Sequence, residues 1–173
     1  MSTTAPQKVF EFALKMEADG ERFYRALAAD CKDRGIRQIF NSLADDELRH
    51  SEALRQLEQD VVPVLKRTTV LTDARNVFAD MARQAFLAVG QDEAALYRQA
   101  LVMETSSRDL YQAQARQTKS KSARKMFLLL AQEEERHRFL IEVISDFSAG
   151  PEAWLQRKEY ERLDDSREPE PEN

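Results

Sequence analysis

The sequence repeats itself after 87 residues, and this repeat restricts the folds open to the chain more than any other feature. When the chain is shifted by 87 positions, similar residues coincide along both halves. The matches include Phe10 with Tyr97, Leu14 with Leu101, Met16-Glu17 with Met103-Glu104, Tyr24 with Tyr111, Phe40 with Phe127, Leu43 with Leu130, Glu47 with Glu134 and His50 with His137. Two copies of one structural unit predict a fold with a pseudo-twofold axis between them.

Apolar residues within each copy recur every three or four positions, which is the spacing of a helix face. Four long helices are therefore predicted, at about 6–31, 36–60, 92–118 and 122–148. Gly35 marks the first break, and Gly150 with Pro151 ends the fourth helix. The chain has only four glycines and five prolines, too few for the many turns of a β-sandwich or barrel. The predicted fold class is all-α.

The connection between the second and third helices is long, whereas the other two connections are short. Pro63 breaks the second helix, and a shorter amphipathic helix is predicted at 73–89, closed by Gly90. Two antiparallel hairpins joined by a crossover form a four-helix bundle. A short C-terminal helix is predicted at 154–163. We therefore expect one domain over residues 1–163 and a disordered acidic tail over 164–173.

The overall composition excludes several classes of function. The formal net charge of −5 gives no general attraction to nucleic acid or to an anionic membrane, and the basic run at 119–125 is expected to be a solvated helix junction. One cysteine, Cys31, permits neither an internal disulfide nor a Cys-x-x-Cys metal site. No stretch has the pattern of a secretory signal or a membrane span. A cytoplasmic location is expected.

Each half of the repeat contains a Glu followed thirty residues later by a Glu-x-x-His pair. Glu and His three positions apart lie on the same helix face, one turn apart. The apolar pattern turns this face inward, where four unpaired carboxylates would each cost several kcal/mol and would repel one another. Two divalent cations balance these charges. The predicted ligands of a two-metal site are Glu17, Glu47, His50, Glu104, Glu134 and His137.

Two tyrosines and two further glutamates lie near these predicted ligands. Tyr24 and Tyr111 follow the lone Glu of their helices by seven residues, or two turns. Their hydroxyls either bond a ligand carboxylate of the opposite half and orient it, or belong to plain core tyrosines. Glu133 and Glu135 flank Glu134 and are expected to point to solvent. Carboxylate-rich ligands with some nitrogen favour iron or manganese, and zinc remains an alternative.

These motifs resemble the rubrerythrin branch of the ferritin-like superfamily. The resemblance rests on Glu17-x6-Tyr24, Glu47-Leu-Arg-His50, Glu104-x6-Tyr111 and Glu134-Glu-Arg-His137, and covers nearly all of residues 6–148. It implies an up-down-down-up bundle, a carboxylate-bridged di-iron centre, and chemistry with hydrogen peroxide or dioxygen. Two features differ from the classical members. The four-cysteine rubredoxin-like module is missing, and Ser107 stands where those proteins have an extra glutamate.

Three functional hypotheses follow. The favoured one is an oxidoreductase, a peroxide reductase or ferroxidase, in which Glu47 and Glu134 bridge two irons that Glu17, Glu104, His50 and His137 complete. Peroxide or dioxygen would receive two electrons, one from each iron, with a proton from Tyr24 or Tyr111 and with electrons resupplied by an external donor protein. The alternatives are iron storage or delivery without turnover, and a structural module with a vestigial site. A homodimer is expected.

Overall fold

The computed structural model describes residues 5–59, 61, 63, 65–83 and 94–164. Within these ranges every regular element is a helix, which confirms the predicted all-α class. The long helices lie within two residues of their predicted ends: they are α1 (Ala5–Asp30), α2 (Arg34–Glu58), α4 (Ala94–Gln117) and α5 (Lys121–Ala149). The shorter elements are α3 (Val70–Arg83), α6 (Pro151–Gln156) and the 3-10 helix η2 (Glu159–Arg162).

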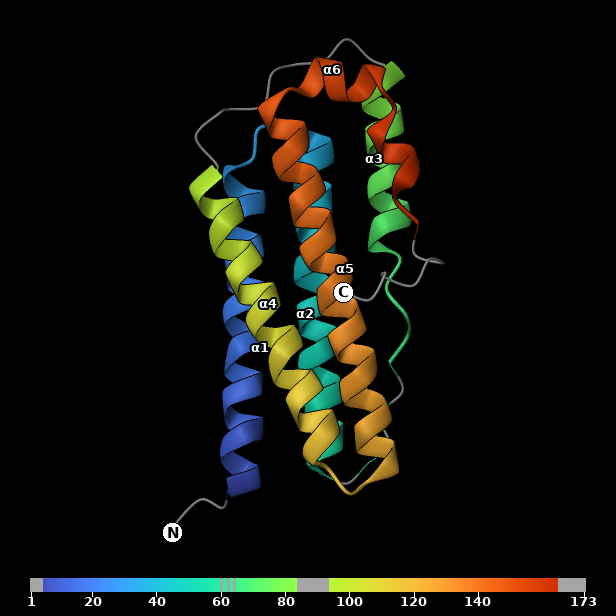
Figure 1. Cartoon of the computed structure of the whole chain (residues 1–173). Helices are drawn as coiled ribbons and strands as arrows, with labels where there is room; N and C mark the ends of the chain where they lie inside the picture. The colour runs from blue at the N-terminus through green and yellow to red at the C-terminus, as the bar shows by residue number, and fades with distance from the viewer. Residues whose placement is uncertain (1–4, 60, 62, 64, 84–93, 165–173) are drawn as a thin grey trace.

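The four long helices form two hairpins that run up, down, down and up (Figure 1). In each hairpin a three-residue turn leads to an N-cap at an equivalent position of the repeat. Oδ1 of Asp33 accepts a hydrogen bond from the backbone N–H of Ile36 at the start of α2, at 2.9 Å. Oγ of Ser120 accepts from the N–H of Ala123 at the start of α5, at 3.3 Å. The repeat thus extends to the caps, where each acceptor satisfies one otherwise unpaired N–H.

The apolar core is divided into two clusters along the bundle axis. One cluster lies toward the end that α3 and α6 cover and contains Phe40, Leu43 and Phe78. The other lies toward the opposite end and contains Leu54, Phe127 and Leu130. On each long helix the predicted metal ligands fall between the residues of these two clusters. The core therefore sandwiches the candidate site between two apolar layers.

The crossover contains a helix, as predicted, but α3 begins three residues before the expected position 73. The rest of the predicted crossover helix, at 84–89, and Gly90 lie outside the described residues. Helix α3 packs against α2, α5 and α6 on the side of the bundle away from α1 and α4 (Figure 1). This third layer covers the upper part of one face of the bundle (Figure 1) and leaves the α1–α4 side uncovered by other described elements.

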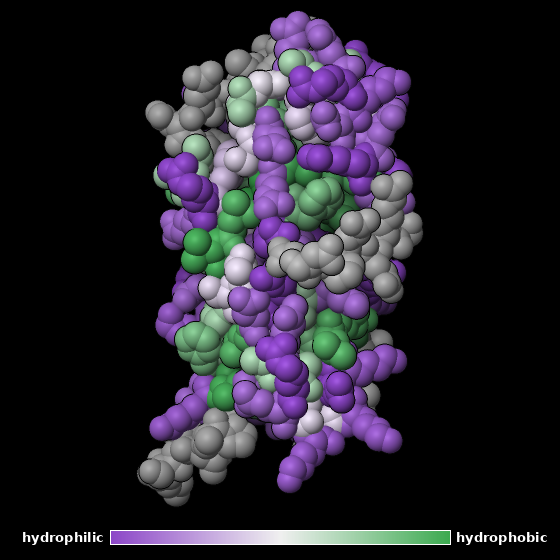
Figure 2. Space-filling model, in the orientation of Figure 1, coloured by the Kyte–Doolittle hydropathy of each residue, from purple (hydrophilic) through white to green (hydrophobic). Residues whose placement is uncertain are grey.

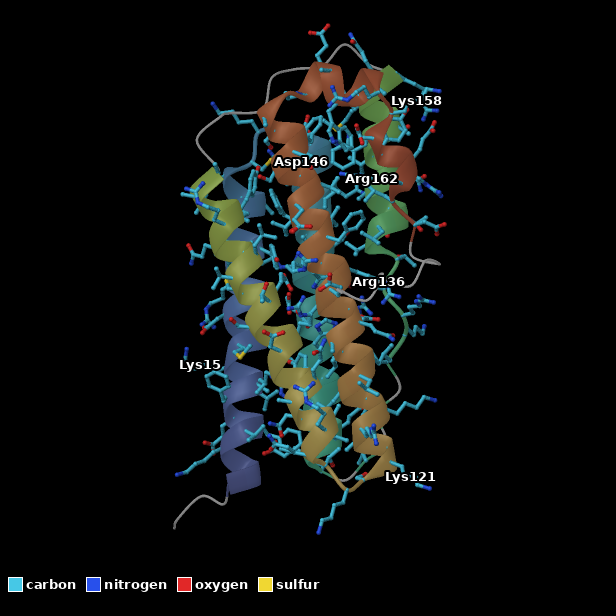
Figure 3. The ribbon with its side chains drawn as sticks, viewed as in Figure 1. Lys15, Lys121, Arg136, Asp146, Lys158 and Arg162 are labelled. Atoms are coloured by element: carbon cyan, nitrogen blue, oxygen red, sulfur yellow. The ribbon has the colours of Figure 1, made fainter. Side chains whose placement is uncertain are left out.

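The predicted C-terminal helix is present, but it starts three residues before position 154 and is interrupted at Lys158. Pro151 opens α6 as its first residue, where its missing N–H costs nothing, and so begins a helix directly after ending the previous one. Lys158, in the left-handed conformation with φ 54°, separates α6 from η2. Arg162 of η2 lies beside Asp146 of α5, with 3.7 Å between Nη2 and Oδ2 (Figure 3). The predicted disordered tail lies outside the described residues, apart from Asp164.

None of the helices that the structure describes combines the length and apolar character required of a membrane-spanning helix.

Trp154 is the anchor of this C-terminal segment, so its truncation is expected to destabilise the bundle. The buried indole lies 4.7 Å from the ring centroid of Phe78 and 5.4 Å from that of Phe147. We expect Trp154→Ala to lower the free energy of unfolding by about 3 kcal/mol, because it leaves a cavity between α3 and α5. Urea denaturation measures this, with the exposed Leu128→Ala as control. Equal losses in both variants would contradict the packing described.

Candidate metal centre

The six residues predicted as ligands meet at the centre of the bundle. All six are buried, and they come from all four long helices. Their ligand atoms form two groups, each within 4.8 Å: one is Glu17, Glu47, His50 and Glu134, and the other is Glu47, Glu104, Glu134 and His137. Glu47 and Glu134 belong to both groups. The two groups are related by the 87-residue repeat, with one carboxylate and one imidazole unique to each.

Both imidazoles turn the Nδ1 atom toward the carboxylates. Nδ1 of His50 lies 2.9 Å from Oε1 of Glu134 and 3.4 Å from Oε2 of Glu17. Nδ1 of His137 lies 3.5 Å from Oε1 of Glu47 and 3.6 Å from Oε2 of Glu104. The two rings are stacked at 5.5 Å with an angle of 17° between their planes. Nδ1 is therefore the atom of each histidine that is placed to bind a metal.

Several of these inward-facing atoms have no hydrogen-bond partner. They are Oε2 of Glu17, Nδ1 of His50, Oε2 of Glu104, both carboxylate oxygens of Glu134 and Nδ1 of His137. Nδ1 of His50 lies 2.9 Å from Oε1 of Glu134, but the geometry is not that of a hydrogen bond, so both atoms are available to a cation. Leaving this many buried polar atoms unpaired is costly, whereas two cations coordinated by them would satisfy every one. The residues therefore fit a two-metal site.

The opposite nitrogen of each imidazole bonds a carboxylate from the other hairpin. Nε2 of His50 lies 3.1 Å from Oε2 of Glu133, and Nε2 of His137 lies 3.1 Å from Oδ2 of Asp46. A carboxylate at this position accepts the Nε2–H, which fixes the tautomer that leaves Nδ1 free for a metal and makes that nitrogen more basic. Each histidine is thus oriented by the half of the repeat to which it does not belong.

The prediction that Glu133 faces solvent is wrong. Its side chain is fully buried, because the segment between α2 and α3 covers this side of α5 and donates the N–H of Thr68 to Oε1 of Glu133 at 3.0 Å. Glu135, expected to be solvated as well, is half-buried and pairs with Arg108 at 2.8 Å and with Arg138. The apolar stripe in the sequence of α5 marks only one buried face, whereas the crossover segment at Thr68 buries a second face of this helix.

Three residues of the site were missed at the level of sequence: Asp46, Glu133 and Thr68. A signal existed for the first two, because the 87-residue shift places Asp46 on Glu133, each one position before a predicted ligand. Thr68 has no counterpart in the repeat. Its hydroxyl donates to Oδ2 of Asp46 while its backbone N–H donates to Glu133. One buried threonine therefore joins both supporting carboxylates.

Both tyrosine hydroxyls bond a ligand carboxylate across the hairpins. Tyr24 of α1 donates to Oε1 of Glu104 on α4, and Tyr111 of α4 donates to Oε1 of Glu17 on α1. Each bond holds one oxygen and leaves the other, Oε2, directed at the central space. Burial and the charge of Glu104 raise the pKa of Tyr24 well above its usual value. The phenol therefore stays protonated and remains a donor.

Electrostatics in the metal-free site favour bound protons. Burial and the neighbouring Glu47 raise the pKa values of Glu17 and Glu134 well above that of an ordinary carboxyl group. Burial also opposes charge on the histidines, but the surrounding carboxylates outweigh it, so the pKa of His50 is raised well above its usual value and that of His137 to about 10. Burial opposes ionisation of Glu47 as well, yet the nearby imidazoles of His137 and His50 lower its pKa.

Comparison with known proteins points to one family. The sequence model of the family described as Rubrerythrin matches residues 8–89 and 96–171, which is most of the chain. The comparisons with curated proteins and with solved structures returned no match.

Metal binding is expected to release protons and to weaken as pH falls. Because both histidine pKa values are raised, the metal-free protein carries two imidazolium groups at pH 7, and a cation must displace those protons to reach Nδ1. Protons held by Glu17 and Glu134, whose pKa values are also raised, would be displaced too, so we expect release of at least about two protons per pair of ions. Calorimetric titrations in buffers of different ionisation enthalpy count them. Binding near pH 7 without proton release would contradict this description of the site.

The two glutamates that flank Glu134 offer a matched pair of variants. Glu133→Gln is expected to weaken binding of one ion of the pair by about 10- to 100-fold, because the neutral amide no longer makes the His50 imidazole more basic. Glu135→Gln is expected to bind both ions normally, since Glu135 contacts only arginines among the charged residues that the structure places around it. Anaerobic ferrous titration measures both affinities. Equal ferrous affinities in the two variants would show that Glu133 does not support the metal site.

Proposed function

Because the chain belongs to the rubrerythrin family, we propose that it is a two-iron oxidoreductase that reduces hydrogen peroxide or dioxygen with electrons from an external donor. The observation that carries the proposal is the convergence of unpaired Nδ1 and carboxylate atoms in two groups that share Glu47 and Glu134. Sharing by two carboxylates supports a pair of adjacent cations rather than two independent ones. A redox pair can transfer two electrons to a single small molecule.

The charges and donor types of the site support iron. Four carboxylates balance two divalent cations, and two neutral imidazoles complete the ligand set without adding charge. Oxygen-rich sites with some nitrogen suit iron and manganese, whereas closed zinc sites are built mainly from cysteine and histidine in tetrahedral arrangements. Two ferrous ions bound here would supply two electrons, one from each, which is the number that cleaves one O–O bond.

The protein's own groups would position the ligands and exclude water. Tyr24 and Tyr111 hold Glu104 and Glu17 through Oε1, and Asp46 and Glu133 hold the imidazoles through Nε2. The apolar clusters on either side keep bulk water from the axis of the bundle. Reduction of peroxide to two waters consumes two electrons and two protons, and the hydroxyls of Tyr24 and Tyr111, which hydrogen-bond the ligand carboxylates, lie where they would relay protons to the site.

The electrons must be supplied from outside the site. The sequence contains a single cysteine, so it cannot build the four-thiolate iron centre that would relay electrons within the chain. An external reductant, such as an electron-transfer protein, would return the iron pair to the ferrous state after each peroxide. A single turnover, by contrast, requires only the ferrous protein and the oxidant.

Peroxide added to the ferrous-loaded protein under anaerobic conditions is expected to oxidise two irons per peroxide, about tenfold or more faster than free ferrous iron. Glu17→Ala and Glu104→Ala are expected to lose this acceleration, because each removes a ligand unique to one metal position. Glu21→Ala, one turn farther along α1, is the control. Stopped-flow absorbance measures the rates, and metal analysis measures the iron content.

A rate equal to that of free iron, or full activity in Glu17→Ala and Glu104→Ala, would overturn the proposal. If the protein binds ferrous iron, does not oxidise it when peroxide is added and later releases it, the result would instead indicate iron storage or delivery.

A further inference from the structure

A cavity of about 230 Å³ lies between α1 and α4, on the side of the bundle that α3 does not cover. Two of the candidate ligands, Glu47 and Glu104, form part of its wall. The cavity therefore connects the surface of the α1–α4 side with the candidate metal centre. Nothing in the proposed reduction of hydrogen peroxide requires a space of this size.

The outer wall of the cavity is apolar. Phe12 and Met16 line it from α1, and Val102 and Met103 line it from α4. Phe12 and Val102 are 57% and 66% exposed, so large apolar side chains stand at the mouth of the cavity. In Figure 2, hydrophobic residues reach the surface along the side of the molecule where Figure 1 places α1 and α4. Exposed apolar side chains gathered around a cavity are typical of a binding site for apolar groups.

The inner wall is formed by small residues at equivalent positions of the repeat. Gly20 lies one turn after Glu17, and Ser107 lies one turn after Glu104. A Cβ atom at position 20 would lie only 3.2 Å from Cδ of Glu47, so a larger residue there would press on a candidate ligand. Because Ser107 lines the cavity, a longer side chain at 107 would occupy part of it. Both halves of the repeat thus keep the approach to the site open.

The charge at the cavity is balanced. Asp19 is the one charged residue of its lining besides the two ligand glutamates, and it pairs with Lys15 at 2.6 Å and with Arg22. Lys15 extends from α1 at the side of the molecule (Figure 3). An uncharged molecule can therefore enter without meeting an unpaired charge at the mouth.

We propose that this cavity binds the organic group of an alkyl or aryl hydroperoxide and directs its O–O bond at the metal centre; the inference rests on the function proposed above. A water molecule occupies about 30 Å³ of liquid, so hydrogen peroxide alone would leave most of the space and its apolar walls in contact with water. An organic group of several carbons displaces that water. The reaction is ROOH + 2e⁻ + 2H⁺ → ROH + H₂O, in which the O–O bond breaks and the external donor is oxidised.

Binding can be tested without any turnover. Cumyl alcohol carries the organic group of cumene hydroperoxide but lacks the O–O bond. In metal-free and in zinc-loaded protein with ¹³C-methyl methionine, we expect cumyl alcohol to shift the resonances of Met16 and Met103, which line the cavity. Met81 on α3 and Met126 on α5 lie outside it and serve as internal controls. No shift, or equal shifts of all four, would overturn the inference.

Selectivity provides the second test. Single-turnover oxidation of the ferrous protein gives second-order rate constants for cumene hydroperoxide and for hydrogen peroxide. We expect the double variant Phe12→Gln/Val102→Gln to lower the rate constant for cumene hydroperoxide by about tenfold or more, because it removes apolar contacts at the mouth of the cavity. The rate constant for hydrogen peroxide is expected to stay the same, so the ratio of the two constants falls by the same factor. Leu128→Gln replaces an exposed apolar side chain on α5 by the same amide, away from the cavity, and is expected to leave the ratio unchanged.

The outcomes separate the two proposals. Oxidation by hydrogen peroxide, with no reaction of cumene hydroperoxide or no effect of the double variant on the ratio, would overturn the hydroperoxide inference and leave the proposed function intact. Failure of both peroxides to oxidise the bound iron would overturn the proposed function and this inference with it, even if cumyl alcohol binds.

Discussion

The structure depends on placing four carboxylates and two imidazoles in the buried centre of a helical bundle. Such groups are tolerated only when they are paired, protonated or coordinated, and several of the atoms here have no partner within the protein. The apolar clusters on either side, the tyrosine hydroxyls and the supporting carboxylates all hold these groups in place. The bundle is therefore built around a centre that is unfavourable by itself, and bound cations would contribute to its stability by mass action.

The same centre joins the two hairpins. Tyr24 donates from the first hairpin to the second, Tyr111 donates in the reverse direction, and each histidine is oriented from the opposite half. Ligand positions therefore depend on how the hairpins dock, and docking depends on bonds to the ligands. A duplicated unit reaches this arrangement easily, since the tyrosine and histidine contacts between the halves are each made twice, once in each direction.

Sequence pattern predicted most of the fold, because helical periodicity and the repeat are local or symmetric signals. The ligand set followed from Glu-x-x-His on two apolar faces. Glu133 was assigned to solvent because the prediction treated α5 as having one buried face, whereas the crossover covers a second. Thr68 could not be found, since its role arises only when the crossover folds back. The start of α6 was misplaced because a proline both stops one helix and begins the next.

Thr68 also makes the two halves of the centre unequal. Glu133 receives a backbone N–H, a donor fixed in direction, whereas Asp46 receives a hydroxyl that can rotate and also pairs with Arg49. The two imidazoles are therefore polarised to different degrees, because the carboxylate behind each is neutralised differently. Cations held at the two positions would therefore meet imidazoles of different basicity. A nearly symmetric chain thus offers two positions that can be told apart, because one crossover segment has no counterpart in the repeat.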